Sequence, residues 1–237
     1  MWHFIINMGC CIESSHESNR DTLENRCERT LHRVEKELGL ESFSVIKFTT
    51  GIARFAQDQQ MTKTQLIKGL GNLGFDTAFL DADRSPKRRF FERLMNRDNK
   101  TFSAVKLEAL GILLCSDTLN NKAHALFMNY DRDCSNNIDS IELTSMIEDI
   151  CYISIDCILD LAIESGKESE KADLGQYKNL LIDQKKKLVN YYMHILVYHV
   201  DNMTREVFTR ALQEYGVRRL FSSEGCRRMA YEYANPS

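Results

Sequence analysis

Apolar side chains recur along most of the chain at the spacing of amphipathic helices. The pattern is clearest on both sides of the polar run 131–142. One helical face precedes this run and another follows it, with apolar residues at i, i+3, i+4 and i+7. The members are Ala123, Phe127 and Tyr130 before the run, and Leu143, Met146, Ile147 and Ile150 after it. The pattern predicts a helix, a polar loop and a second helix.

The loop Asp-Arg-Asp-Cys-Ser-Asn-Asn-Ile-Asp-Ser-Ile-Glu has oxygen-bearing residues at the positions that an EF-hand calcium loop requires. Side-chain oxygens fall at positions 1, 3, 5, 9 and 12, and position 7 contributes a backbone carbonyl. The predicted ligands are Asp131, Asp133, Ser135, Asn137, Asp139 and Glu142. Asn136 replaces the usual glycine at position 6, and asparagine tolerates the left-handed backbone needed there. Up to seven oxygens with a bidentate glutamate suit one Ca²⁺ better than Mg²⁺. The alternative is an acidic interhelical loop that binds no metal.

A second copy of this pattern lies 36 residues upstream. Phe91, Leu94, Phe102 and Leu107 align with Phe127, Tyr130, Ile138 and Leu143. The ligand positions, however, are occupied by Met95, Arg97, Asn99, Ser103 and Lys106. A lysine at position 12 opposes a cation directly, so we expect this loop to bind no metal.

Two further copies are related to each other by an offset of 142 residues. Met61, Leu66, Leu70 and Gly74 match Met203, Phe208, Leu212 and Gly216. In both copies a methionine stands at position 8, and the glycine stands where a helix would end. Neither loop has a set of oxygen ligands, so neither is expected to bind calcium. The alternative is two unrelated amphipathic helices.

The apolar position-8 residues Met61, Phe102, Ile138 and Met203 follow one another as in a protein with four EF-hands. Over roughly residues 43–217 the chain resembles the neuronal calcium sensor, calcineurin-B-like and calaxin group. The resemblance implies an all-α fold of paired EF-hands in two lobes, with short β-bridges between paired loops. The expected divisions are an N-terminal segment (1–42), a lobe of two degenerate hands (43–116), a lobe with the functional third and the degenerate fourth hand (117–217), and a tail (218–237). Within the second lobe, the polar residues 164–174 are expected to form a linker.

The N-terminal segment contains two candidate features. Thr22 to Leu40 has the apolar spacing of an amphipathic helix. If translation begins at Met8, then Gly9 becomes a candidate for myristoylation and Cys10 and Cys11 become candidates for palmitoylation. The alternative is a frayed terminus with two ordinary thiols.

Composition narrows the class of protein. The chain has 237 residues, of which 27% are charged and 43% hydrophobic, and its net charge of −3 gives no electrostatic reason to expect nucleic-acid binding. Eight cysteines without zinc-ligand spacing suggest free thiols in the reducing cytoplasm. No apolar run is long enough to cross a membrane, so membrane association is expected only through an acylated N-terminus.

No catalytic motif accompanies these features. Gly69, Gly71 and Gly74 match the glycine spacing of dinucleotide-binding loops, but they follow a predicted helix rather than a strand. We therefore expect a protein that is not an enzyme.

Two functions remain after these exclusions. The first is a calcium-binding regulatory protein with one site, which binds an amphipathic helix of a target protein in a groove containing Met128, Met146 and Met193. The alternative is a structural EF-hand subunit of a larger assembly, either independent of calcium or constitutively loaded.

Overall fold

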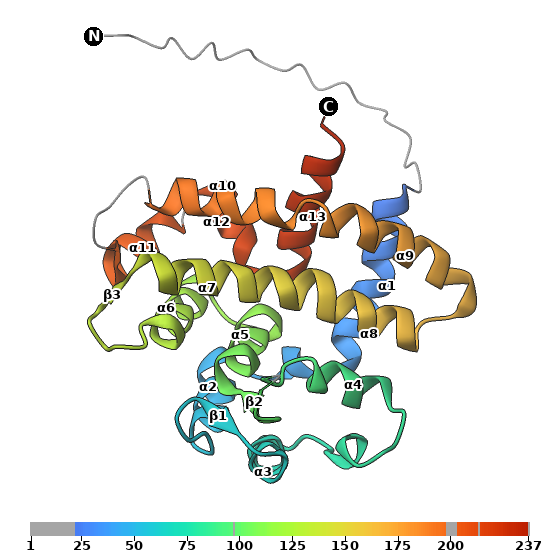
Figure 1. Ribbon diagram of the computed structural model, residues 1–237, viewed down its shortest axis with the longest axis horizontal. Coiled ribbons are helices and arrows are strands. Elements are labelled where there is room, and N and C mark those ends of the chain that lie inside the picture. The colour runs from blue at the N-terminus through green and yellow to red at the C-terminus, as the bar shows by residue number, and fades with distance from the viewer. Residues whose placement is uncertain (1–21, 97, 198–202, 213, 237) are drawn as a thin grey trace.

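The computed structural model describes residues 22–96, 98–197, 203–212 and 214–236. These residues fold mainly into helices, joined at two places by short antiparallel strand pairs (Figure 1). The expected all-α fold class is therefore confirmed at the level of secondary structure.

The N-terminal unit comprises residues 45–114. Its elements are α2 (Val45–Ala53), β1 (Gln60–Met61), α3 (Lys63–Leu73), the 3-10 helix η2 (Ala78–Leu80), α4 (Pro86–Glu92), β2 (Phe102–Ser103) and α5 (Ala104–Leu114). Each α-helix begins after a serine or threonine whose side chain accepts a hydrogen bond from the first turn, namely Ser44, Thr62, Ser85 and Ser103. Such caps satisfy backbone donors that have no partner within the helix, so the sequence fixes these starts locally.

The C-terminal unit comprises residues 119–234. Its elements are α6 (Leu119–Tyr130), β3 (Asn137–Ile138), α7 (Ser140–Cys151), the π-helix η3 (Tyr152–Cys157), α8 (Ile158–Ser165), α9 (Glu168–Ile182), α10 (Lys185–Val197), β4 (Met203–Thr204), α11 (Arg205–Ala211), α12 (Tyr215–Arg218), the 3-10 helix η4 (Arg219–Phe221) and α13 (Ser223–Ala234). Ahead of both units lie α1 (Leu23–Glu37) and the 3-10 helix η1 (Leu40–Ser42). The amphipathic helix expected within residues 22–40 is therefore present.

The two strand pairs join the apolar residues that the sequence places at position 8 of each loop. Met61 lies opposite Phe102 in the β1–β2 pair, and Ile138 lies opposite Met203 in the β3–β4 pair. All four side chains are buried. The short bridges expected between loops one and two, and between loops three and four, are present in that register.

The loops that precede these bridges share a backbone feature. Gln59, Lys100 and Asn136 each lie two residues before a bridge residue, and their φ angles are 60°, 56° and 60°. This left-handed conformation is costly for residues other than glycine. Its recurrence in three loops supports the internal repeat that the sequence suggests.

The expected linker 164–174 is helical except at Gly166 and Lys167, so this prediction is wrong. Glu170 accepts a hydrogen bond from the Lys167 backbone, and acidic residues in the first turn of α9 favour a helix start. The polar side chains are not a sign of a mobile connector, since they contact α1. Asp173 and Glu170 pair with Arg26 and Arg33 at 2.7 and 2.8 Å.

The two glycines expected to end helices differ. Gly74 caps α3 with φ of 90°, as expected. Gly216 lies inside α12, while α11 ends earlier, with Leu212 as its cap. The proposed equivalence of these glycines is wrong, because α11 is a shorter helix than α3.

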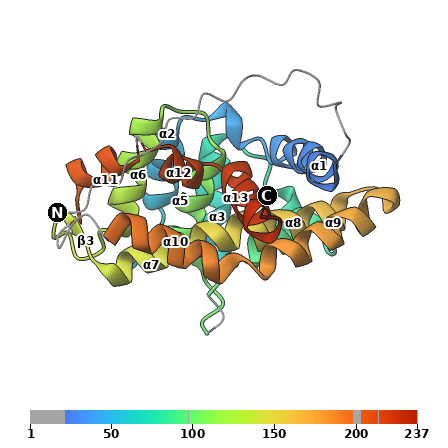
Figure 2. The same cartoon turned by 90° about the horizontal axis from the view of Figure 1, so that it is seen from above.

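Helices from the two ends of the described chain pack together on α8 and α9. In Figure 2, α1 and α13 lie beside α8 and α9, and contacts join all four helices. At their centre Arg227 of α13 is fully buried. Its guanidinium donates to both carboxylate oxygens of Glu28 at 2.8 and 2.7 Å and to Glu35 at 2.8 Å. Tyr177 of α9 also donates to Glu28, at 2.8 Å.

Ion pairs attach the N-terminal unit to the group formed by α1, α8, α9 and α13. Arg89 of α4 and Arg93, the C-cap residue of α4, each donate to Glu164 of α8 at 2.7 Å. Because α7, η3 and α8 follow one another without a break, the helix that leaves loop 131–142 extends to the contact with α4 (Figure 1).

The described cysteines are all free thiols, and all except Cys134 are buried. Within the described part of the chain, no helix combines the length and apolar character needed to cross a membrane.

Candidate metal centre

The loop between α6 and α7 contains the predicted metal ligands. Asp131 is the C-cap of α6, and Asp139 is the N-cap of α7. The helix, loop and helix expected from the sequence are therefore in place, with Ile138 anchored in the strand pair just before α7 begins.

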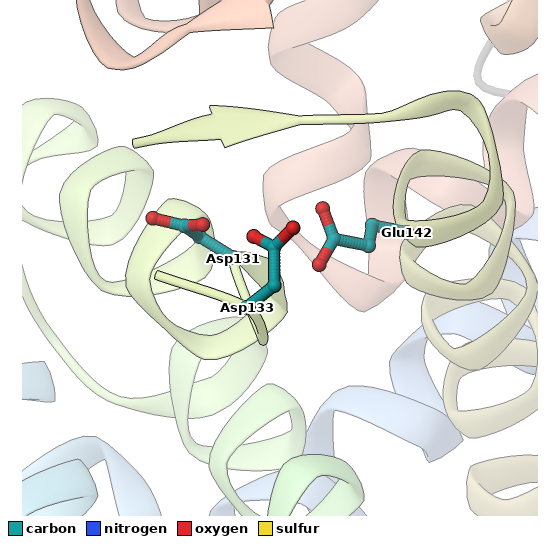
Figure 3. Close-up of side chains that lie close together, drawn as sticks. All are labelled: Asp131, Asp133 and Glu142. Carbon is teal, nitrogen blue, oxygen red and sulfur yellow. The ribbon is translucent and has the colours of Figure 1, made fainter. Parts of the chain in front are cut away.

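Three carboxylates converge within this loop. Asp131, Asp133 and Glu142 each contribute an oxygen to a group in which all three oxygens lie within 4.8 Å of one another. Figure 3 shows the carboxylates of Asp133 and Glu142 turned toward one another, while the carboxylate of Asp131 lies on the other side of Asp133. Asp131 is buried, with 7% of its surface exposed, whereas Asp133 is exposed.

Ser135 and Asn137 complete the inner edge of the loop. The Ser135 hydroxyl lies 3.4 Å from Asp131 Oδ1 and 2.9 Å from the Asn137 carbonyl oxygen. The carboxylate of Asp131 also accepts a hydrogen bond from the backbone N–H of Asn136, at 3.1 Å. The left-handed backbone of Asn136 thus directs its N–H toward Asp131, the residue at position 1 of the loop. The loop closes here and brings the predicted ligands near one another.

Glu142 and Asp139 are fixed by the start of α7. The two oxygens of Glu142 accept hydrogen bonds from the backbone N–H groups of Arg132 and Asp139, at 2.8 and 3.2 Å. Asp139 accepts in return from the N–H groups of Ile141 and Glu142, at 2.7 and 2.8 Å. This reciprocal capping box orients Glu142 toward the loop. Asp139 itself lies outside the group of three converging carboxylates.

The donor set fits a hard cation. Hydrogen bonds from the Ser135 hydroxyl and backbone lower the pKa of the Asp133 carboxyl, so this ligand stays ionised at neutral pH. Carboxylate, hydroxyl and carbonyl oxygens are the ligands that Ca²⁺ prefers, whereas softer metals favour imidazole or thiolate. Cys134 lies in the loop and is exposed, but it is not part of the oxygen cluster.

The second loop is closed by hydrogen bonds of its polar side chains to one another and to Gln60 of β1. Gln60 of β1 accepts from the side chains of Asn99 and Thr101, and Asn99 accepts from the Thr101 backbone at 3.1 Å. Lys106, at position 12, is directed away from its loop. Its ammonium lies 3.8 Å from Asp149 of α7 and 5.3 Å from the ring centre of Tyr152.

Loops one and four also lack a cation cluster in the described residues. Gln65, at position 12 of the first loop, caps α3 by accepting from the Thr62 backbone at 2.7 Å. Part of the fourth loop, residues 198–202, lies outside the described residues. Among the residues that the structure describes, Asp131, Asp133 and Glu142 form the one group of acidic, histidine or cysteine side chains close enough to hold a metal.

The candidate acylation sites Gly9, Cys10 and Cys11 lie outside the described residues.

The expected methionine groove is not open in this structure. Met146 is fully buried, Met193 is partly buried and Met128 is 56% exposed. The apolar faces of α6 and α11 are covered by the chain itself, because the ring of Phe221 of η4 packs edge-on against Phe208, and the ring of Phe208 packs at a tilt against Phe127. The sequence predicts residues 218–237 only as a tail that wraps or frays, and it does not predict that they fill this space.

No protein-family model matches the chain, and no curated protein or solved structure matches it either. What the chain does is therefore inferred from its site and its fold.

Proposed function

We propose that this chain is an EF-hand calcium-binding regulatory protein with one functional site, at residues 131–142. The observation that carries the proposal is the convergence of Asp131, Asp133 and Glu142 within 4.8 Å, in a loop that connects two helices. A bound calcium ion would supply a divalent positive charge among these carboxylates, held by Asp131, Asp133, Ser135, Asn137, Asp139 and Glu142.

The arrangement of the loops supports four EF-hands in two pairs. Strands join loop one to loop two and loop three to loop four, in the register expected from the position-8 residues. The left-handed residues Gln59, Lys100 and Asn136 occupy the same place in three of these loops. In this proposal the first, second and fourth hands serve as scaffold.

The site is physically connected to the rest of the fold. Glu142 lies in the first turn of α7, which continues through η3 into α8. The same continuous helix contacts α4, α1 and α9 near its other end. Any displacement of the Glu142 carboxylate would therefore reach both units, and this would couple calcium to the binding of an amphipathic helix from a target protein.

A structural EF-hand subunit of a larger assembly is the second candidate. It is favoured by the closure of the second loop through Gln60, Asn99 and Thr101, and by the burial of Met146 and Phe208. In this case calcium would be constitutive or absent and would not change the exposed apolar surface.

Calorimetric titration with Ca²⁺ tests the proposed site. We expect one site with a dissociation constant on the order of 10⁻⁶ M. The Glu142→Gln variant should lose this binding, whereas Glu148→Gln, an exposed carboxylate of the same helix, should keep it. Absence of calcium heat in the wild type, or unchanged binding by Glu142→Gln, would reject the proposal.

Binding of an apolar dye, compared between chelator and saturating calcium, separates the two candidates. A calcium-dependent rise in dye binding indicates a regulator, and an unchanged signal with calcium bound indicates a scaffold.

The free buried thiols support a cytoplasmic location. Association with membranes is proposed only if Gly9 is acylated, which mass spectrometry of the native N-terminus would decide; nucleic acid and catalysis have no place in this proposal.

A further inference from the structure

A groove of about 390 Å³ lies between α2 and α3 of the N-terminal unit. We call it the outer groove, and its lining residues are Ile46, Lys47, Thr50, Gly51, Arg54, Phe55, Asn72 and Leu73. The two helices approach closely at its base, since a Cβ atom at Gly51 would lie 2.7 Å from the Leu73 side chain. The base is thus a well-packed surface between two helices.

The outer groove faces away from the core. Val45, Phe48 and Ile52 form the buried face of α2, and each has no exposed surface. Ile46 lies on the other side of this helix and is 54% exposed. An exposed large apolar side chain beside a concave apolar surface is typical of a site that another chain covers.

The charges around the outer groove have one sign. Lys47 and Arg54 are exposed residues of the lining and stand seven positions apart in the sequence. No carboxylate belongs to the lining. The ammonium of Lys47 lies 5.3 Å from the ring centre of Phe43, which extends the apolar and cationic surface along α2. A complementary ligand therefore combines an apolar side chain with carboxylates.

We propose that the outer groove binds an acidic amphipathic segment of a partner protein. An apolar side chain of that segment contacts Ile46, Phe55 and Leu73, and its carboxylates face Lys47 and Arg54. The outer groove belongs to the unit whose loops have no cluster of metal ligands in the described residues, and it lies at the end of the molecule opposite α10 and α13 (Figure 1). Binding there is separate from the calcium site and does not require calcium.

A peptide-display selection on the full chain tests this proposal. A library of random 16-residue peptides is selected on the wild type and counter-selected on the Ile46→Asp variant. We expect the recovered peptides to combine apolar residues at helical spacing with an excess of Asp and Glu. Their affinity should fall by about tenfold or more in Ile46→Asp and in the double variant Lys47→Glu/Arg54→Glu, a change that corresponds to one interface contact of ordinary strength.

Lys186→Glu/Lys187→Glu is the matched control for the charge reversal, because both lysines are exposed and lie on α10, at the opposite end of the molecule. This variant should bind the peptides as the wild type does. Glu142→Gln should also bind them, with or without calcium, so failure of the calcium proposal and failure of this one are distinguishable.

Several results would overturn the proposal. One is the absence of peptides that distinguish the wild type from Ile46→Asp, and another is a set of recovered peptides without acidic residues. If removal of residues 1–21 raised peptide affinity about tenfold, the outer groove would be assigned to the chain's own N-terminal segment. If Ile46→Asp abolished a concentration-dependent dimer in sedimentation, a second copy of the chain would be the occupant.

Discussion

The ammonium group of Lys106 lies 3.8 Å from Oδ1 of Asp149, so that a residue of the second loop pairs with the helix that leaves the third. Lys106 occupies the position where a calcium loop has its bidentate glutamate. Asp149 also accepts a hydrogen bond from Tyr130 at 3.0 Å. The lysine at this position thereby supplies a contact between the two units.

The pair Lys106 and Asp149 should couple the stabilities of the two units. Both side chains are mostly buried, with 28% and 16% of their surface exposed, so we expect a coupling free energy of about 1 kcal/mol. A double-mutant cycle with Lys106→Met and Asp149→Asn, followed by chemical denaturation, measures it. The exposed pair Lys63 and Asp81 is the control and should give close to zero. Equal coupling in both cycles would contradict the expectation.

Loss of Arg227 should be among the most damaging changes in the chain. Arg227→Met leaves the buried Glu28 and the partly buried Glu35 without their cation, and this costs about 3–5 kcal/mol of the free energy of unfolding. Arg228→Met removes a neighbouring exposed ion pair with Glu224 and should cost less than about 1 kcal/mol. Denaturant titration compares them, and similar losses in the two variants would show that the buried network contributes little.

Two glycine substitutions should act in opposite directions. A methyl group at Gly111 of α5 would collide with the ring of Phe48, so Gly111→Ala should destabilise the fold by about 1–3 kcal/mol. Gly175 lies within α9, and nothing lies within 4 Å of the position its Cβ would take. Gly175→Ala should therefore stabilise by about 0.5–1 kcal/mol. Thermal unfolding of both variants is the measurement; the same direction of change in both would be the contrary result.

Glu108 should make stability depend on pH between about 4.5 and 7. Burial raises the pKa of its carboxyl from 4.5 to about 7. Over this range the folded chain keeps a proton that the unfolded chain has lost, so the free energy of unfolding falls as pH rises. The fall is at most about 3 kcal/mol, and the contribution of this group is constant above pH 7.

The Glu108→Gln variant should lose this component, because its amide does not titrate. Denaturation at a series of pH values compares it with the wild type. Parallel profiles for the wild type and Glu108→Gln would contradict the assignment.

The elements that the sequence predicted well are those fixed by local chemistry. Asp139 and Glu142 form a capping box whose residues are three positions apart, and Met61, Phe102, Ile138 and Met203 stand at fixed places relative to helix starts. Helix starts and loop positions of this kind can be predicted from apolar periodicity and loop spacing alone. The three converging carboxylates were predicted for the same reason.

What the sequence did not reveal depends on contacts between distant residues. The polar start of α9 resembled a linker because its partners, Arg26 and Arg33, lie more than 130 positions earlier in the chain. The burial of Met146 and the placement of Phe221 on Phe208 likewise depend on segments that no local pattern connects. A helix whose polar residues find partners elsewhere cannot be distinguished by composition from one that remains in solvent.

The pairing of Glu28 with Arg227 also has a consequence for the order in which the protein is made. The two residues are 199 positions apart, and the carboxylate is synthesised first. Until α13 leaves the ribosome, Glu28 and Glu35 have no buried cation to neutralise them, and α1 cannot take its final place against α8 and α9. Among the described residues α1 is translated first, and it is therefore expected to be one of the last helices to reach its final packed position.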